Sequence, residues 1–439
     1  MQETLKRFLE QAAPYIGLKS ISTDMAFQPD IQATVEWLTT QFKQNGFKVD
    51  ILQGPTTNPV VVAHYHISDD VETILNYGHY DVQPASIEEG WNQDPFTLAI
   101  YEDRVEGRGV VDNKLQTFIH IFTAFELIKR GQLKYNLKFM IEGNEESGNQ
   151  DMEKLIVEHA DLLTSDYILI SDGEIGAYPS IEMSLRGGGN FTLNFKTSNE
   201  DTHSGLFGGI MPNAAMELAI FLSKLKNPKN GRVLVPGFYD GVIPVSAEIL
   251  QTNKTLAESI DILPLTGTKV LIGEHDRLTQ NGFMPTLEIT GYNTGYTGEG
   301  YRNAIPGKAF AKINLRTVVP QDPQAVFNSI RAYAEEQIPE YVEWMITDDS
   351  VYQGVRVNTD TPMVQHIMAL QEEIYGVKPI LTACGAGIPI VTSFQTLFGA
   401  DALLVSLGND TCRMHGVNEN YELIYLERGL QLSERLLSK

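Results

Sequence analysis

The chain has 439 residues, of which 42% are hydrophobic, so we expect two domains with substantial cores. Its 33 basic and 56 acidic residues give a net charge of −23, which disfavours nucleic acids and anionic membranes as partners and attracts cations. Two cysteines are too few for a disulfide framework or a thiolate zinc site, and no apolar run approaches the roughly 20 residues that span a bilayer. The amphipathic start lacks the apolar centre of a signal peptide, so we expect a globular cytoplasmic protein.

Strands alternate with helices in the first part of the chain. Two helices are expected within residues 1–46, interrupted between residues 17 and 30. The expected strands lie at residues 47–52, 59–66, 72–77, 136–141 and 167–170, and further helices at residues 114–130 and near 151–163. This alternation predicts an α/β sheet with helices on both faces.

The pattern changes after the glycine run at residues 187–189. Apolar and polar residues alternate from Phe191, as in a sheet with one solvated face. A helix at 213–226, a Gly/Pro/Thr-rich stretch at 236–306, a strand at 309–315 and a helix at 323–337 follow. The end of the chain contains a helix from Pro389, a strand at 402–406 and a closing helix. We therefore predict a first domain formed by residues 1–186 and 356–439, and an inserted α+β domain at residues 187–355.

Acidic residues and one histidine follow the predicted strands of the first domain. They are His79, Asp112, Glu145, Glu146 and Asp172. Each has an ordinary explanation by itself, because aspartate caps helices, adjacent glutamates are usually solvated, and Ser-Asp-Gly forms turns. A second His-x-acid pattern, at His159 and Asp161, lies in a predicted helix, where residues two apart do not face each other, so we place His159 on the helix surface.

Taken together, these side chains predict a metal site. In an open α/β sheet the carboxyl ends of the strands face one crevice, where four carboxylates would repel one another unless cations neutralised them. Nitrogen and oxygen ligands without thiolate suit Zn²⁺, Mn²⁺ or Co²⁺. Two metal ions would need a bridging carboxylate and one further ligand, for which His415 is the best candidate. Asp81, two residues after His79, could accept the second ring N–H of that histidine.

The motifs that contain these residues resemble those of the M20 family of dinuclear metallopeptidases, most closely its cytosolic non-specific dipeptidase (carnosinase-like) branch. The resemblance spans nearly the whole chain and is carried by Gly78-His-Tyr-Asp-Val-Gln-Pro84, Gly107-Arg-Gly-Val-Val-Asp-Asn-Lys114, Glu142-Gly-Asn-Glu-Glu-Ser-Gly148, Ser171-Asp-Gly173 and Met414-His-Gly-Val-Asn-Glu419. It implies a zinc-exopeptidase-like catalytic domain, an inserted lid and dimerisation domain, a homodimer, and hydrolysis of dipeptides or short peptides.

The resemblance also implies a role for each site residue. Asp112 bridges two metal ions; His79 and Asp172 complete one site, and Glu146 and His415 complete the other. Glu145 is the general base and Asp81 orients His79. His203 reaches the partner subunit's site and stabilises the oxyanion, while Arg316 grips the terminal carboxylate of the substrate. The alternatives are a buried structural role for His203 and a surface salt bridge for Arg316.

Three departures from the family pattern affect the predicted substrate pocket. Asn303 stands where a threonine is expected, and Gly387 lacks the serine hydroxyl of the usual Gly-Gly-Ser-Ile-Pro loop. An Arg-Glu pair before this loop is here Ala383-Cys384. A fourth departure, Asn113 in place of an aspartate after Asp112, lies outside this pocket and should leave the metal ligands intact. An N-acyl-amino-acid deacylase that uses the same metal site is therefore an alternative, and a non-catalytic metal- or peptide-binding protein is a second one.

Overall fold

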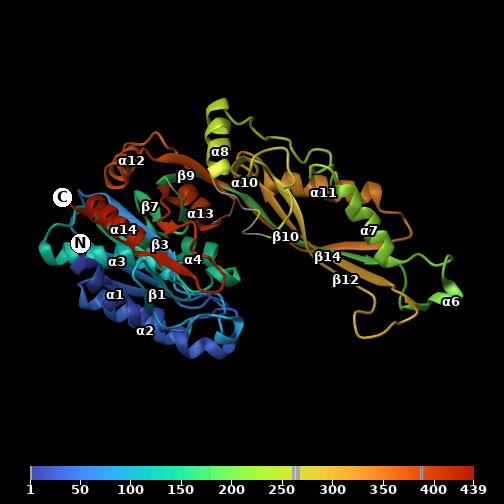
Figure 1. The fold of residues 1–439 in the computed structure, drawn as a ribbon, viewed down its shortest axis with the longest axis horizontal. Coiled ribbons are helices and arrows are strands. Elements are labelled where there is room, and N and C mark those ends of the chain that lie inside the picture. The colour runs from blue at the N-terminus through green and yellow to red at the C-terminus, as the bar shows by residue number, and fades with distance from the viewer. Residues whose placement is uncertain (1, 177, 260–262, 264–266, 386, 388) are drawn as a thin grey trace. The chain divides into compact units, whose positions relative to one another are not determined.

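The computed structural model describes residues 2–439 except 177, 260–262, 264–266, 386 and 388. The chain divides into two compact units (Figure 1). The first contains Met1–Met183, Val357–Thr382 and Ile390–Lys439, and the second contains Ser184–Arg356 and Ala383–Pro389. The short segment 383–389, which the sequence assigns to the last part of the first domain, thus belongs to the second unit.

A six-stranded sheet forms the centre of the first unit. Its order is β1 (Lys48–Leu52), β2 (Val60–Tyr65), β6 (Asn136–Glu142), β3 (Thr73–His79), β7 (Tyr167–Ile170) and β18 (Asp401–Leu404). The last four strands are parallel, whereas β1 and β2 are antiparallel to their neighbours. β3 is buried from Ile74 onward, which explains its continuous apolar sequence.

Helices cover both faces of this sheet. α3 (Lys114–Arg130) leads from β3 to β6, and α4 (Met152–Glu158) with α5 (Ala160–Leu163) leads back across β3 to β7. The connection from β3 to β6 and the connection from β6 to β7 move across the sheet in opposite directions. Because crossovers between parallel strands are right-handed, α3 and α4 lie on opposite faces of the sheet. The other helices of this unit are α1 (Gln2–Ile16), α2 (Gln28–Gln44), α12 (Pro362–Tyr375), α13 (Pro389–Phe398) and α14 (Leu423–Leu437). The predicted mixed α/β sheet with helices on both faces is confirmed.

One helix prediction needs correction. The single helix expected near residues 151–163 is two short helices, and His159 lies between them as the C-cap of α4 and the N-cap of α5. Its φ of −116° and ψ of 28° are not helical, so this histidine ends one helix instead of lying on its surface.

Short strands position the loops that follow the large sheet. β4 (Ala99–Ile100), β5 (Arg104–Glu106) and β20 (Asn420–Glu422) form a three-stranded sheet. β8 (Glu174–Ile175) pairs with β19 (Gly408–Asn409), and β9 (Ser180–Leu185) lies between β16 (Val355–Arg356) and β17 (Ile380–Cys384). Among the described residues, 3₁₀ turns occur at Met25–Phe27, Ile87–Glu89 and Glu145–Ser147. The pairing of β5 with β20 brings the loop before α3 beside the loop before α14.

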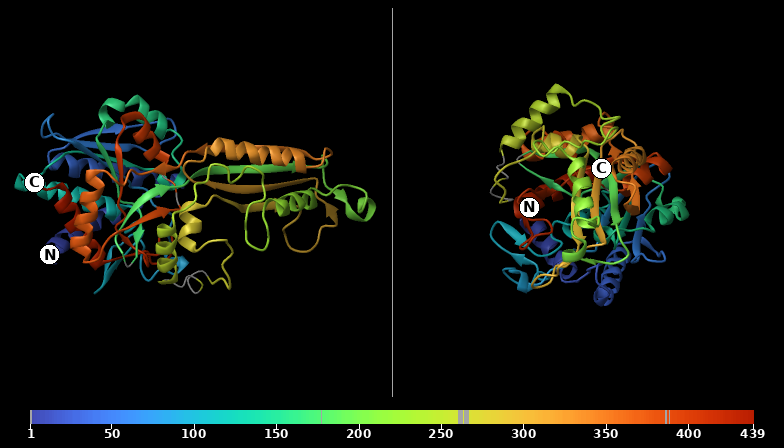
Figure 2. Two further views of the ribbon diagram at one scale, coloured as in Figure 1. Left: turned by 90° about the horizontal axis from the view of Figure 1, so that it is seen from above. Right: turned by 90° about the vertical axis from the view of Figure 1, so that its right-hand side faces the viewer.

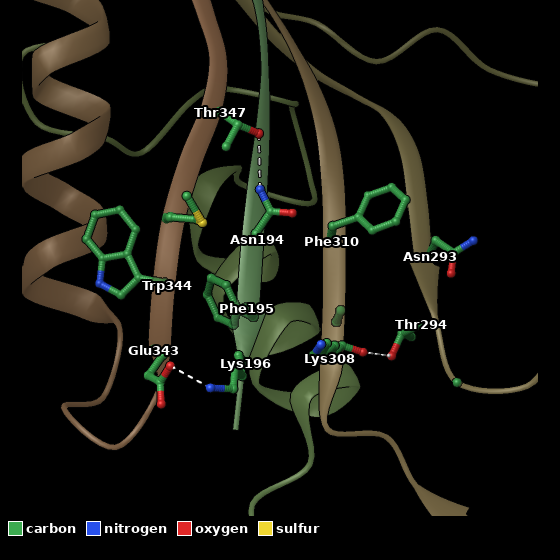
Figure 3. Close-up of a pocket in the computed structure, with 13 residues that line it drawn as sticks. Asn194, Phe195, Lys196, Asn293, Thr294, Lys308, Phe310, Glu343, Trp344 and Thr347 are labelled. Atoms are coloured by element: carbon green, nitrogen blue, oxygen red, sulfur yellow. Dashed lines mark hydrogen bonds and ion pairs between the residues drawn. The ribbon is translucent and has the colours of Figure 1, made fainter. Parts of the chain in front are cut away.

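An antiparallel sheet forms the second unit. Its order is β12 (Thr286–Thr294), β14 (Lys308–Thr317), β10 (Gly187–Lys196) and β15 (Glu343–Tyr352), and the strands run side by side (Figure 2). Phe191, Leu193 and Phe195 alternate along β10 and pack in one core with α7 (Ala214–Leu225) and α11 (Pro323–Gln337). The other face of the sheet borders a cavity of about 640 Å³ (Figure 3).

Several elements of the second unit were not predicted. The Gly/Pro/Thr-rich stretch contains α8 (Ala247–Ser259), α10 (Arg277–Phe283) and β12. A register shift between Ile289 and Gly291 interrupts the alternation along β12, which hides this strand in the sequence. The described residues of this unit also form β11 (Thr202–His203), α6 (Ser204–Phe207) and β13 (Ala304–Ile305). Among the described residues, no helix combines the length and the apolar character that crossing a membrane requires.

Candidate metal centre

Two groups of potential metal ligands lie in the first unit and share one residue. The first group is His79, Asp112 and Asp172, and the second is Asp112, Glu146 and His415. Within each group the ligand atoms lie within 4.8 Å of one another. The structure therefore brings together all five side chains that the sequence singled out as metal ligands, from segments as far apart as residues 79 and 415.

Asp112 lies between the two histidines. Its Oδ1 is 3.0 Å from Nε2 of His79, and its Oδ2 is 2.7 Å from Nε2 of His415. Asp172 Oδ2 lies 3.6 Å from His79 Nε2, and Glu146 Oε2 lies 3.2 Å from His415 Nε2. Because each oxygen of Asp112 faces a different group, this carboxylate has the arrangement that bridges two metal ions.

His79 is the last residue of β3 and is completely buried. Its Nδ1 lies 3.0 Å from the main-chain oxygen of Asp81 and 3.4 Å from Oδ1 of the same residue. The shorter contact of Nδ1 is thus with the carbonyl of Asp81, and the carboxylate that the sequence predicted as acceptor lies slightly farther away. A carbonyl can only accept, so Nδ1 carries a proton, and Nε2 is the ring nitrogen that would bind a metal ion. His79 Nε2 is buried and, although Asp112 Oδ1 lies 3.0 Å away, it has no partner in hydrogen-bond geometry among the described residues.

The carboxylate of Asp81 instead holds the loop that carries the two glutamates. Its oxygens accept hydrogen bonds from the backbone N–H groups of Glu145 and Glu146, each at 3.2 Å. The hydroxyl of Ser22 donates to the same carboxylate at 2.6 Å. Asp81 thereby fixes the turn Glu145–Ser147 beside β3, and Gln83 Nε2 donates to Glu146 Oε2 at 2.7 Å.

The electrostatics of this centre favour cations. Burial first, and then the neighbouring carboxylates, raise the pKa of Asp172 to about 7 and that of Glu145 to about 8. Hydrogen bonds to Asp112 and Glu146 raise the pKa of His415 to about 10. The raised pKa values mean that protons reduce the repulsion between the neighbouring carboxylates. Divalent cations bound in the same place would reduce this repulsion too. The bridging carboxylate, the oriented imidazole and the thiolate-free donor set all fit two divalent metal ions.

A buried ion pair joins the two loops that supply Asp112 and His415. Glu419 is fully buried and accepts hydrogen bonds from the backbone N–H groups of Val111 at 2.8 Å and Asp112 at 3.1 Å. Its other oxygen accepts from Arg108 Nη1 at 2.8 Å, and Arg108 Nη2 donates to the main-chain oxygen of His415 at 3.3 Å. No role was predicted for these two residues from the sequence. The sequence indicated a pairing only through their opposite charges, in motifs that are far apart in the chain, since 311 positions separate the two residues.

The other predicted site residues belong to the second unit. His203 is exposed, so the alternative of a buried structural histidine does not apply. Its Nδ1 accepts a hydrogen bond from the backbone N–H of Gly205 at 3.0 Å, which leaves the proton of the neutral ring on Nε2. Asn303 lies beside His203, because the main-chain carbonyl of Asn303 accepts a hydrogen bond from the N–H of Ser204 and the next residue, Ala304, pairs with His203. The side chain of Asn303 is exposed.

Arg316 is half-buried on β14 and has neutral partners. Its Nη1 donates to the hydroxyl of Tyr352 at 2.7 Å, and its Nε donates to Oδ1 of Asn314 at 3.3 Å. This differs from the surface salt bridge that was the alternative for this residue. Gly387 belongs to the same unit, within the segment that returns from the first unit.

A mixed α/β sheet with two adjacent ligand groups at the carboxyl ends of its strands defines a metal-dependent hydrolase. Residues 75–439 match the profile of peptidase family M20/M25/M40, and the chain belongs to this family. The family predicted from the motifs is confirmed.

Alignments with relatives and with solved structures cover nearly the whole chain. Cys-Gly metallodipeptidase DUG1 of Saccharomyces cerevisiae is 27% identical over 97% of this chain and 93% of its own length. The structure of human carnosine dipeptidase 1 superimposes with a TM-score of 0.85 at 25% identity, covering 99% of this chain and 96% of that one. An M20 family metallo-carboxypeptidase from Sulfolobus solfataricus also reaches a TM-score of 0.85, at 26% identity over 100% and 99% of the two chains.

Proposed function

We propose that this chain is a dipeptidase that uses two divalent metal ions. The observation that carries the proposal is the position of Asp112, whose two carboxylate oxygens face His79 and His415 separately. Asp172 would complete one metal site and Glu146 the other, which accounts for both ligand groups. The names of the relatives, a Cys-Gly metallodipeptidase and a carnosine dipeptidase, support dipeptides as substrates.

Zinc is the proposed metal, with manganese and cobalt as alternatives, because the donor set contains only imidazole and carboxylate groups. When bound, such ions lower the pKa of water and polarise a carbonyl oxygen. The ligands are held by the protein itself: Asp81 orients His79 through its carbonyl, Gln83 orients Glu146, and Glu419 orients the backbone of Asp112.

Glu145 is the proposed general base. Its carboxylate would take a proton from the attacking water and deliver it to the nitrogen of the leaving amine. The hydrogen bond from its N–H to Asp81 fixes its position next to Glu146. Glu145 is not one of the ligands in either group, so its carboxylate remains available for proton transfer.

Residues of the second unit are proposed to bind the substrate. His203 would donate its Nε2–H to the oxyanion that forms at the scissile carbonyl, since its Nδ1 is already an acceptor. Arg316 would bind the C-terminal carboxylate with its planar guanidinium, and Asn303 and the backbone of Gly387 would add hydrogen bonds.

A homodimer is part of this proposal, with His203 acting in the partner subunit's site. Large apolar side chains are exposed on and between α6 and α7, the two helices that follow His203 in the chain, and exposed apolar side chains in a group are typical of an association surface. They are Leu206, Phe207, Ile210, Met216 and Ile220. A cytoplasmic location, as expected from the sequence, is also part of the proposal; Cys384 and Cys412 form no disulfide in the described part of the chain.

Hydrolysis assays with metal-depleted protein test the function. Dipeptides and N-acetyl amino acids would be supplied with Zn²⁺, Mn²⁺ or Co²⁺ added back in parallel. We expect metal-restored cleavage of dipeptides and little cleavage of N-acetyl amino acids. Cleavage of the N-acyl substrates alone would establish the deacylase alternative, and cleavage of neither by protein with two bound metal ions would establish the non-catalytic one.

A further inference from the structure

Arg316 and Tyr352 meet across a strand that lies between them. In the sheet of the second unit both residues stand opposite Gly188 of β10, Arg316 on β14 and Tyr352 on β15. Neighbouring strands lie about 4.8 Å apart, so two strands separate the backbones of this pair by roughly 10 Å. Nevertheless, Arg316 Nη1 donates a hydrogen bond to Tyr352 Oη at 2.7 Å.

Gly188 lies on the strand between Arg316 and Tyr352 and has no side chain. Its φ is +133°, and a Cβ at this position would lie 2.0 Å from the main-chain oxygen of Leu315. Only glycine is therefore accommodated between Arg316 and Tyr352.

Tyr352 also occupies the space next to Gly387. A Cβ on residue 387 would lie 2.7 Å from Tyr352 Oη and 2.8 Å from its Cε2. It would also lie 2.4 Å from the main-chain oxygen of Arg186. A serine at residue 387 and the present position of the Tyr352 ring are thus incompatible. The hydroxyl that the loop lacks at Gly387 is replaced in the same space by a hydroxyl from β15.

The surroundings of this pair favour an anion. Within the described part of the chain, the hydrogen-bond partners of both Arg316 and Arg186 are neutral. Arg186 donates to the main-chain oxygen of Gly385 at 2.7 Å and, at 3.4 Å, to the hydroxyl of Thr286, which stands opposite Arg316 in the sheet. Burial and the charge of Arg316 lower the pKa of Arg186 to about 10. A carboxylate would satisfy the guanidinium groups better than these neutral partners do.

We propose that Tyr352 is the residue that makes this chain select substrates with a free C-terminal carboxylate. Its phenol holds the guanidinium of Arg316 beside Gly387 and takes the place of the missing loop hydroxyl. The inference rests on the proposed function, because that function assigns the substrate carboxylate to Arg316. Tyr352 acts through Arg316 and is a positioning residue.

The first test compares Tyr352→Phe with the control Tyr341→Phe. Tyr341 is an exposed tyrosine of the same unit whose hydroxyl donates to Glu217 at 3.1 Å. With a dipeptide we expect Tyr352→Phe to raise KM about tenfold and to leave kcat within about twofold, because a hydrogen bond to a charged group is lost. With the corresponding dipeptide amide KM should not change. Equal effects on both substrates, or none on either, would contradict the proposal.

The second test uses the incompatibility with a side chain at residue 387. Gly387→Ser should lower the thermal unfolding midpoint more in the wild-type background than in Tyr352→Ala, where the ring is absent and only the contact with the main-chain oxygen of Arg186 remains. The double variant Tyr352→Ala/Gly387→Ser should regain part of the carboxylate preference that Tyr352→Ala loses. If Gly387→Ser has the same effect in both backgrounds, Tyr352 does not occupy this space.

Binding measurements separate this proposal from the proposed function. Calorimetry with a phosphinic dipeptide analogue and its C-terminal amide reports carboxylate selection without turnover. If the wild-type protein cleaves no dipeptide but prefers the carboxylate, and Tyr352→Phe loses that preference, the inference stands and the proposed function fails. If the protein cleaves dipeptides and Tyr352→Phe binds both analogues as the wild type does, the function stands and the inference is overturned.

Discussion

The buried carboxylate of Glu419 accepts a hydrogen bond from the backbone N–H of Asp112 at 3.1 Å. Through Arg108, the same carboxylate is connected to the main-chain oxygen of His415, which lies 3.3 Å from the arginine Nη2. Glu419 thus links two proposed ligands of one metal site without contacting a metal itself. Its own negative charge is balanced by Arg108, which is 3% exposed.

Glu419→Gln should weaken metal binding at the group formed by Asp112, Glu146 and His415. A glutamine side chain has one acceptor oxygen where the carboxylate has two, and it leaves Arg108 without a buried counter-charge. Loss of such an outer-shell partner typically lowers metal affinity about 10- to 100-fold. We expect the metal content at limiting zinc to fall from two ions per chain towards one, as measured by mass spectrometry of the eluted metal.

The control for this variant is Glu106→Gln. Glu106 is also buried and paired with an arginine, since Arg104 Nε lies 2.9 Å from it, but it does not accept from the backbone of Asp112. Its metal content should match that of the wild type. Equal losses in both variants would mean that general destabilisation, and not the position of Asp112, is responsible.

Glu145→Gln should abolish turnover while both metal ions stay bound. Glutamine is similar in size but cannot take a proton from water, and general-base catalysis contributes about 10²- to 10⁴-fold to rates. We expect kcat to fall by that factor and the metal content to remain at that of the wild type. Glu153→Gln, on the exposed surface of α4, serves as the control. Unchanged turnover in Glu145→Gln would remove Glu145 from the mechanism.

Mixing two inactive variants tests whether His203 acts in the partner subunit's site. Glu145→Gln and His203→Ala should each be inactive as homodimers. After random exchange at equal concentrations, half of the dimers are mixed and each has one intact composite site, so roughly a quarter of wild-type activity should return. Activity that stays at the level of the separate variants, with exchange verified by native mass spectrometry, would show that His203 does not act across a dimer.

His120 should make the metal-free protein less stable in acid. Burial lowers the pKa of this histidine to about 4, below its ordinary value of 6.5. Between these two values the unfolded chain binds a proton that the folded chain does not, so stability is complete above pH 6.5 and falls as the pH approaches 4. The loss amounts to about 3 kcal/mol at most.

Urea unfolding at pH 7 and pH 4.5 measures this effect. His120 is held between the hydroxyls of Ser171 at 2.9 Å and Ser433 at 3.0 Å, and glutamine can bond to hydroxyls without titrating. The free energy of unfolding should therefore depend less on pH in His120→Gln than in the wild type. The exposed His66 provides the control, and His66→Gln should keep the wild-type dependence. The same pH dependence in all three proteins would contradict the assignment to His120.

The positions of most candidate ligands followed from the sequence because of a general property of parallel sheets. β3, β6 and β7 are parallel, so their carboxyl ends share one edge, and His79, Glu146 and Asp172 come together there. The alternation along β10 likewise indicated a sheet with one buried face. By contrast, β12 was not predicted, since its bulge breaks the alternation on which such predictions depend.

What the sequence determined by itself is the set of residue types and their order: acids and a histidine after buried strands, in motifs that identify the family. Only the tertiary structure decided that the two oxygens of Asp112 face different histidines, that Glu419 holds the backbone of Asp112, and that Tyr352 reaches Arg316 over Gly188. The physical reason is the separation along the chain between the residues that are in contact. Local patterns follow from the repeat of a strand or helix, whereas these contacts join residues 33 to 307 positions apart, whose distances depend on the packing of whole elements.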